Sequence, residues 1–176
     1  MYLVCPAGNL PALKAAVDGG ADAVYLGFRD QTNARAFPGL NFTEADLDAG
    51  IVHAHALGRK VYIALNTYPG PAALAGWQAA VDRAAEHGAD AIICADLGVL
   101  DYACRHHPDL PRHLSVQGSA TTHAALRYYH ERFNIARAVL PRVLSIQQVE
   151  RICEQDTVPV EVFAFGSLCI DRKSVV

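Results

Sequence analysis

The sequence predicts an α/β fold, a (βα) TIM-barrel-like parallel barrel. The first observation is a repeated helix-to-strand joint, since Gly-Gly-Ala-Asp-Ala-Val-Tyr-Leu-Gly at 19–27 recurs as His-Gly-Ala-Asp-Ala-Ile-Ile-Cys-Ala at 87–95. In both copies a glycine follows a helical pattern, where a left-handed C-cap costs little for a residue without Cβ. The second observation is the unbroken apolar run that follows each glycine, which is typical of a strand buried on both faces of a parallel sheet. The third observation is that strands and helices alternate along the whole chain.

Six strand–helix units followed by a seventh strand account for nearly all residues. The apolar runs predict strands at 2–5, 23–26, 60–65, 91–95, 113–116, 137–140 and 160–165, and the amphipathic runs predict helices at 10–18, 43–57, 72–87, 97–105, 122–131 and 145–154. An open doubly wound sheet fits the same order, but its Gly-rich first loop is missing from Cys-Pro-Ala-Gly-Asn at 5–9. The barrel is therefore favoured.

A complete barrel of this kind has eight units over ~250 residues. With 176 residues, the sequence predicts a barrel domain over 1–170 that is truncated after about the seventh strand. The last six residues, 171–176, read Asp-Arg-Lys-Ser-Val-Val and extend neither pattern. We expect this tail to be non-native.

Composition limits the function classes. The hydrophobic fraction is 52% and the charged fraction 19%, as in a globular domain, and the net charge is -3 with 15 basic and 18 acidic residues. No basic run gives a nucleic-acid signal, and no apolar stretch approaches the ~20 residues of a membrane span. The five cysteines have no paired spacing and no export signal precedes them, which predicts reduced thiols in a cytoplasmic protein.

Polar side chains follow several of the predicted strands, at the end of a barrel where active sites lie. Together they predict a pocket for a polar or anionic small molecule, with two arginines as carboxylate partners. The candidate binding residues are Asn33, Arg35, Asn66, Gln117 and Arg142. Asn9 and Asp96 occupy similar positions, but they fit helix capping equally well, and both alternatives stay open.

Histidines and most cysteines are expected to be structural. His53 and His55 lie two positions apart on a helix, so they point to nearly opposite sides and cannot share a metal. Cys94, Cys104 and Cys153 fall within a strand and helices, where a thiol acts as a buried apolar group. Cys169 differs, because it follows the seventh strand at the predicted rim of the site and is a candidate metal or cluster ligand, although one thiol alone makes no site.

Several segments resemble the UbiU-like branch of the collagenase-like peptidase family. They are residues 1–27, Thr-Asn-Ala-Arg-Ala-Phe at 32–37, Gly-Leu-Asn-Phe-Thr at 39–43, Leu-Asn-Thr at 65–67, Ala-Asp-Leu at 95–97, Ser-Val-Gln at 115–117, Val-Leu-Pro-Arg-Val-Leu-Ser at 139–145 and Glu-Val-Phe-Ala-Phe-Gly-Ser-Leu-Cys-Ile at 161–170. The resemblance implies an oxygen-independent hydroxylation component of ubiquinone biosynthesis that acts as a heterodimer with a UbiV-like protein. It also implies a ubiquinone precursor as substrate and prephenate as the oxygen donor.

The same resemblance implies a [4Fe-4S] cluster on four cysteines, of which Cys169 matches the first. The other three are expected beyond Ile170, where this sequence has none, so we expect the chain alone to be inactive. Two alternatives stay open. The first is a collagenase-like peptidase, which is disfavoured because no Gly-x-Ser-x-Gly or His-Glu-x-x-His pattern is present. The second is a non-catalytic partner subunit that binds a small molecule.

Overall fold

The computed structural model describes residues 2–155 and 157–166, so Cys169 and the tail 171–176 lie outside the described residues. The chain alternates strands and helices as the sequence predicts. The strands are β1 (Val4–Pro6), β2 (Ala23–Leu26), β3 (Lys60–Leu65), β4 (Ala91–Cys94), β5 (Arg112–Leu114), β6 (Arg137–Val139) and β7 (Val160–Glu161). The helices are α1 (Leu10–Asp18), α2 (Glu44–Ala56), α3 (Leu74–Glu86), α4 (Leu97–His106), α5 (His123–Phe133) and α6 (Ile146–Cys153), with a short 3₁₀ turn, η1 (Val116–Gly118).

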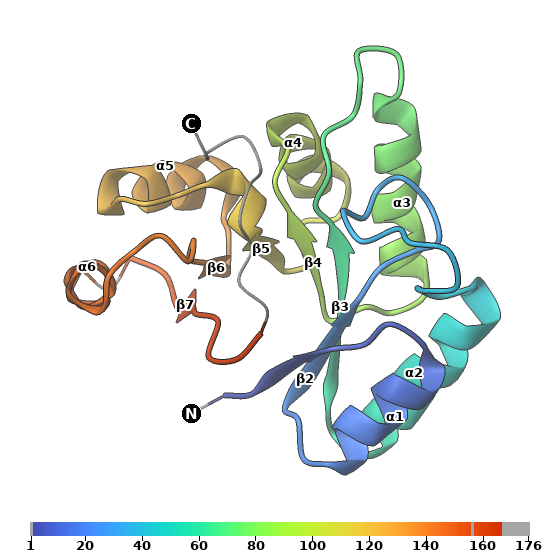
Figure 1. The fold of residues 1–176 in the computed structure, drawn as a ribbon. Helices are drawn as coiled ribbons and strands as arrows, with labels where there is room; N and C mark the ends of the chain where they lie inside the picture. Colours follow the sequence, from blue (N-terminus) through green and yellow to red (C-terminus); the bar gives the residue numbers. More distant parts are fainter. Residues whose placement is uncertain (1, 156, 167–176) are drawn as a thin grey trace.

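All seven strands form one parallel sheet in sequence order, from β1 to β7. The sheet curls, so that β1 and β7 lie at its two ends, and the helices lie on the outside of the curve (Figure 1). Neighbouring helices pack against each other in pairs along this outside, α1 with α2 and α3 with α4. The architecture is therefore the curled α/β half-barrel that the sequence predicts.

The two faces of the sheet have different surroundings. Strand residues on the outer face, such as Ile63, Ile92 and Leu114, are fully buried with the helices in one large core. The inner face carries a smaller cluster of Ala23, Tyr62, Ala91 and Ile93, with Val4 and Tyr25 packed against it. Because successive side chains of a strand point to opposite faces, both clusters arise from the same strands.

The sequence leaves open whether Asn9 and Asp96 cap helices or belong to the pocket, and the hydrogen bonds at the helix N-termini answer this. The Asn9 side chain accepts a hydrogen bond from the backbone N–H of Ala12, and the Asp96 carboxylate accepts from those of Gly98 and Val99. Both residues therefore cap helices, α1 and α4, as N-cap residues do. Ser145 forms a full capping box with Gln148 at the start of α6. None of the described helices is long and apolar enough to span a membrane.

Five of the seven strands are shorter than the sequence predicts, and the last strand differs most. The apolar run 160–165 predicts a strand over its full length, yet β7 covers only Val160–Glu161. Its partner β6 ends at Val139, and one further residue, Leu140, donates its N–H to the Glu161 carbonyl oxygen at 2.8 Å. Pro141 comes next and has no N–H to donate, so the ladder stops there.

Candidate binding site

A cavity of about 380 Å³ lies at the carboxyl ends of the strands. Loop residues form one part of its wall and inner-face strand residues form the other. All five binding residues predicted from the sequence line it, namely Asn33, Arg35, Asn66, Gln117 and Arg142. Their positions agree with the expected pocket, whereas their role in binding stays a prediction.

The loop between β2 and α2 carries Asn33 and Arg35, and Asn41 holds this loop in shape. The buried Asn41 side chain donates to the Arg35 carbonyl oxygen at 2.8 Å and accepts from Asn33 Nδ2 at 2.9 Å. Asn41 has a φ of 73°, a left-handed conformation that asparagine tolerates better than most residues. Its own N–H donates to the Gly8 carbonyl oxygen at 2.7 Å, which ties the loop to the end of β1.

A second set of contacts ties the same loop to the segment after β3. Asn66 Oδ1 accepts the N–H of Ala34 at 2.9 Å, and the Thr67 hydroxyl donates to the Gln31 carbonyl oxygen at 2.6 Å. Trp77 lies on α3, and its indole N–H donates to the carbonyl oxygen and to the hydroxyl oxygen of Thr67, both at 3.2 Å. Asn66 is therefore committed partly to the loop, and these contacts hold the loop that carries Asn33 and Arg35 without a ligand.

An ion pair anchors the base of the loop to α3. Arg83 Nη2 lies 2.6 Å from Asp30 Oδ2, and its guanidinium also stacks over the Phe28 ring at 4.1 Å. Burial alone would raise the pKa of Asp30, but hydrogen bonds from Thr32 and Arg83 outweigh it and the pKa is lowered. Asp30 therefore stays ionised, and it stabilises the loop through Thr32 and Arg83 without lining the cavity.

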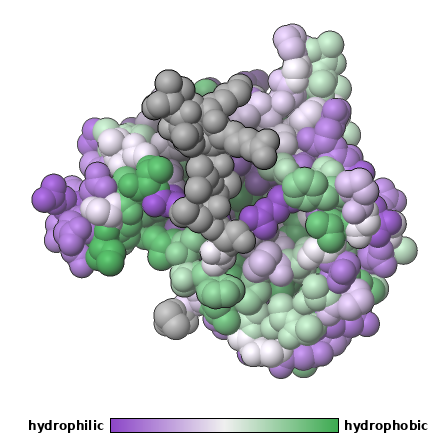
Figure 2. Space-filling view, in the orientation of Figure 1, coloured by the Kyte–Doolittle hydropathy of each residue, from purple (hydrophilic) through white to green (hydrophobic). Residues whose placement is uncertain are grey.

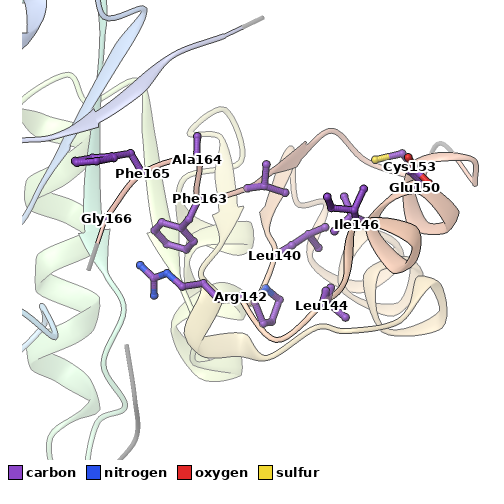
Figure 3. A pocket seen from close by; sticks show the side chains of 13 residues that line it. Leu140, Arg142, Leu144, Ile146, Glu150, Cys153, Phe163, Ala164, Phe165 and Gly166 are labelled. Carbon is purple, nitrogen blue, oxygen red and sulfur yellow. The ribbon is translucent and has the colours of Figure 1, made fainter. Parts of the chain in front are cut away.

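Arg142 stands where the cavity meets a second, mostly apolar groove. Its guanidinium lies 3.7 Å from the centre of the Phe163 ring, a cation–π contact, and Figure 3 shows the two side chains next to each other with α6 at the right. The groove, about 590 Å³, runs from Arg142 along α6 to Cys153. Exposed Val143, Ile146 and Val162 extend its apolar surface, and hydrophobic atoms gather on this side of the molecule in Figure 2.

A partly buried polar cluster lies on the inner face of the sheet. Arg137 Nη1 lies 3.4 Å from Glu161 Oε2, and the Arg137 guanidinium also lies 4.8 Å from the centre of the Tyr2 ring. Burial raises the pKa of Glu161 against the opposing effect of Arg137. Burial, with help from Arg137 and Lys60, lowers the pKa of His113 to about 4, so its imidazole is neutral at pH 7.

The described residues do not fit an iron–sulfur cluster. No group of three or more metal-ligating side chains occurs among them. Cys94 is fully buried, which raises the pKa of its thiol, and Cys104 donates to the Phe133 carbonyl oxygen. Cys153, expected to be buried, is instead exposed beside the groove. Cys169 lies outside the described residues, and its role as a ligand stays a prediction.

The histidine pair on α2 has structural partners, as expected. His53 Nε2 lies 2.8 Å from Asp18 Oδ1, and His55 Nε2 lies 2.8 Å from Asp90 Oδ2. The two rings bind different carboxylates on different neighbours, which agrees with their positions two residues apart on a helix.

Sequence reasoning missed Asn41, Phe163 and Glu161, although all three line the cavity. A signal for Glu161 was available, since it is the one charged residue in the apolar run 160–165 and follows the partly buried Val160. No local pattern marks Asn41, because its role comes from contacts with residues six and eight positions earlier.

Fold and cavity together define an α/β half-barrel with a cavity at the carboxyl ends of its strands. A family model described as peptidase family U32 matches residues 8–173, and the chain belongs to this family. A solved U32 peptidase structure superposes with a TM-score of 0.75 at 17% identity, over 92% of this chain and 68% of that one, which supports the fold.

Several curated relatives have names that refer to RNA hydroxylation. The tRNA hydroxylation protein P of Escherichia coli is 35% identical over 96% of this chain and 37% of its own length. The 23S rRNA 5-hydroxycytidine C2501 synthase of the same species is 28% identical over 97% of this chain and 25% of its own. An uncharacterized protease of Methanocaldococcus jannaschii is 36% identical over 96% and 41%. The chain thus spans well under half the length of these relatives.

Proposed function

We propose that this chain is the small-molecule-binding part of an oxygen-independent hydroxylation protein, and that its cavity takes a dicarboxylate such as prephenate, the oxygen donor. The observation that carries the proposal is the convergence of Arg35 and Arg142 on one cavity, with the amides of Asn33, Asn66 and Gln117 beside them. Guanidinium groups bind carboxylates through paired, charge-assisted hydrogen bonds. The loop contacts described above fix part of this set in advance, which lowers the ordering cost of binding.

The cavity chemistry argues against the peptidase alternative. Among the described residues that line the cavity there is neither a cysteine nor a histidine. Hydrolysis of a peptide bond by a side-chain nucleophile needs an activated serine, threonine or cysteine with a base next to it. The described lining offers the Ser115 hydroxyl, whose oxygen accepts the N–H of Gln117 at 3.2 Å, and neither a histidine nor a lysine to act as its base. A binding pocket for an anion needs only the arginines and amides that are present.

For the hydroxyl acceptor we propose an RNA base, because relatives at 35% and 28% identity carry names that refer to tRNA and 23S rRNA hydroxylation. A second candidate is a ubiquinone precursor, processed with a UbiV-like partner. Two observations favour it. The net charge of -3 offers no long-range attraction for a polyanion, and the apolar groove next to Arg142 suits a hydrophobic aromatic molecule.

Calorimetric titration of the chain with prephenate tests the donor site. We expect binding that weakens about tenfold or more in Arg35→Gln and in Arg142→Gln, since each removes a charge-assisted pair. Arg127→Gln, an exposed arginine on α5, is the matched control and keeps the wild-type affinity. Equal prephenate affinity in all four proteins would refute the proposal.

A chimera separates the two acceptors. Residues 8–166 of this chain would replace the matching part of the Escherichia coli tRNA hydroxylation protein P in cells that lack it. Hydroxylated tRNA nucleosides by mass spectrometry would support the RNA acceptor. Anaerobic ubiquinone restored in cells that lack UbiU, with no change in tRNA, would support the second candidate instead.

The [4Fe-4S] cluster belongs to the same proposal through Cys169 only. The test uses a chimera in which residues 8–170 of this chain are followed by the later part of the Escherichia coli tRNA hydroxylation protein P, since this sequence has no cysteine after Cys169. Iron and sulfide analysis under anaerobic conditions, with Cys169→Ser in the same chimera as the control, measures the cluster. Cluster content that is the same in both proteins would remove Cys169 from the site.

A further inference from the structure

The cavity is polarised. Its loop-borne part carries both arginines, Arg35 and Arg142, which are exposed at the mouth. Its strand-borne part is apolar, with Tyr25, Ile93 and Val139, except for one carboxylate, Glu161. Among the described lining residues Glu161 is the only acidic side chain. A ligand whose carboxylates meet the arginines therefore presents its other end to this carboxylate.

The Glu161 carboxylate keeps capacity to accept further hydrogen bonds. Ionised carboxylates offer about four acceptor positions. Among the described residues, Arg137 supplies the one side-chain hydrogen bond to Glu161, through Oε2 at 3.4 Å. The Glu161 side chain is only 20% exposed, so a ligand that covers it removes the water that remains around the carboxylate. The carboxylate then needs a hydrogen-bond donor from the ligand to replace that water.

From this arrangement we propose that Glu161 is a specificity-determining residue, which selects an anionic ring compound with a hydroxyl group at the end opposite its carboxylate. The hydroxyl donates its hydrogen to Glu161, and the ring lies against Tyr25, Ile93 and Val139. A positively charged or carboxylate-bearing far end fits less well, since Arg137 already neutralises Glu161 and a second carboxylate would be repelled. This inference rests on the proposed function, because it takes the arginines as the carboxylate partners.

Arg137 acts as a positioning residue for Glu161. Its guanidinium is itself held by the Tyr2 ring and pairs with Glu161 from below the cavity, without lining it. A hydrogen-bonded charge partner orients the carboxylate and opposes the rise in its pKa that burial causes. Arg137 is therefore expected to change hydroxyl preference only through Glu161.

The test compares two ligands that differ by one hydroxyl, 4-hydroxyphenylpyruvate and phenylpyruvate, by calorimetric titration of the full chain. We expect the wild type to bind the hydroxylated compound at least tenfold more tightly, as for a hydrogen bond to a charged group. Glu161→Leu brings the two affinities within about twofold, and Glu161→Gln, which keeps an acceptor oxygen, gives an intermediate ratio. Arg137→Gln lowers the ratio, and Arg137→Lys restores it.

Binding of phenylpyruvate serves as the internal control for folding, since every variant keeps the arginines and the apolar wall of the cavity. Its affinity is expected to rise in Glu161→Leu, because no carboxylate is then left without its water. An unchanged preference in Glu161→Leu, with phenylpyruvate still bound, overturns the inference and leaves the proposed function standing. Equal affinity of the wild type for the two compounds likewise overturns the inference and leaves the proposed function standing. If the wild type binds neither compound nor prephenate, the proposed function itself fails, and the inference fails with it.

Discussion

Asn33 lies so close to Gly27 that a Cβ built on this glycine would stand 1.9 Å from Asn33 Nδ2. Gly27 follows directly after β2, so the predicted binding residue rests on the backbone at the end of a strand. The contact explains the position of a buried amide that has no neighbour in the sequence to hold it. It also links a glycine in the repeated joint at 19–27 to the cavity.

Gly27→Ala is expected to displace the Asn33 side chain and break its hydrogen bond to Asn41. The free energy of unfolding should fall by about 1–3 kcal/mol, as for other overpacked positions, and prephenate should bind more weakly. Chemical denaturation and titration measure the two effects. Gly76→Ala is the matched control, because nothing lies within 4 Å of its Cβ position on α3 and alanine favours a helix. Equal stability of both variants would contradict the close contact.

Asn41 gives a test of the loop network separate from backbone strain. Asn41→Gly keeps the left-handed conformation available but removes both side-chain hydrogen bonds, to Arg35 and Asn33. We expect a loss of about 1–3 kcal/mol in the free energy of unfolding. Asn134→Gly, at another left-handed position after α5, should change stability by no more than about 0.5 kcal/mol. If the two substitutions have equal effects, the side-chain network adds nothing.

Sequence patterns predict the fold well where burial alone decides the structure. The bounds of β2, β3 and α1 agree with prediction because their apolar runs have clear ends, such as Gly58 before β3 and Asn9 before α1. The strand at 160–165 is predicted too long, because its length depends on a partner strand that Pro141 ends. Pairing with a distant strand leaves no trace in the local pattern.

The candidate site shows the same division. All five polar residues chosen for their place after strands do line one cavity, since parallel strands bring their carboxyl ends to one edge. Which of them are already occupied by other contacts could not be predicted. Asn66 holds the loop through Ala34, for example, and Asn41 was overlooked, because both roles depend on how the loop 28–42 folds back on the sheet.

Arg112 is a buried cation whose hydrogen bonds all go to backbone carbonyl oxygens. It donates to those of His107, Pro108, Leu110, Phe133 and Asn134 at 2.8–3.4 Å, around the C-terminal ends of α4 and α5. Helix C-termini leave such carbonyls without partners and carry partial negative charge, so one guanidinium satisfies two helix ends.

Arg112→Met should therefore lower the free energy of unfolding by about 3 kcal/mol or more, because buried carbonyl groups lose their donors. Arg112→Lys should recover little, since an ammonium group cannot reproduce the planar fork. Urea denaturation measures both, with Arg127→Met on the exposed side of α5 as control. A lysine variant as stable as the wild type would show that charge alone matters.

His113 should make stability depend on pH. Its pKa is lowered from 6.5 to about 4 in the folded chain, by burial and by the positive charges of Arg137 and Lys60. Between these values the unfolded chain binds a proton that the folded chain does not, so stability rises with pH across this window and is lost as pH falls. The loss attributable to His113 is about 3 kcal/mol between pH 7 and pH 4.

His113→Gln isolates this contribution, because glutamine does not titrate. The substitution removes the contact between the His113 and Tyr62 rings, whose centres lie 4.7 Å apart. At pH 7, where His113 is neutral, the variant should therefore be less stable than the wild type. On acidification its stability should fall less steeply than that of the wild type, and the two curves should converge toward pH 4. Since all other histidines and carboxylates titrate in both proteins, parallel curves would mean that His113 accepts a proton in the folded chain as readily as in the unfolded one.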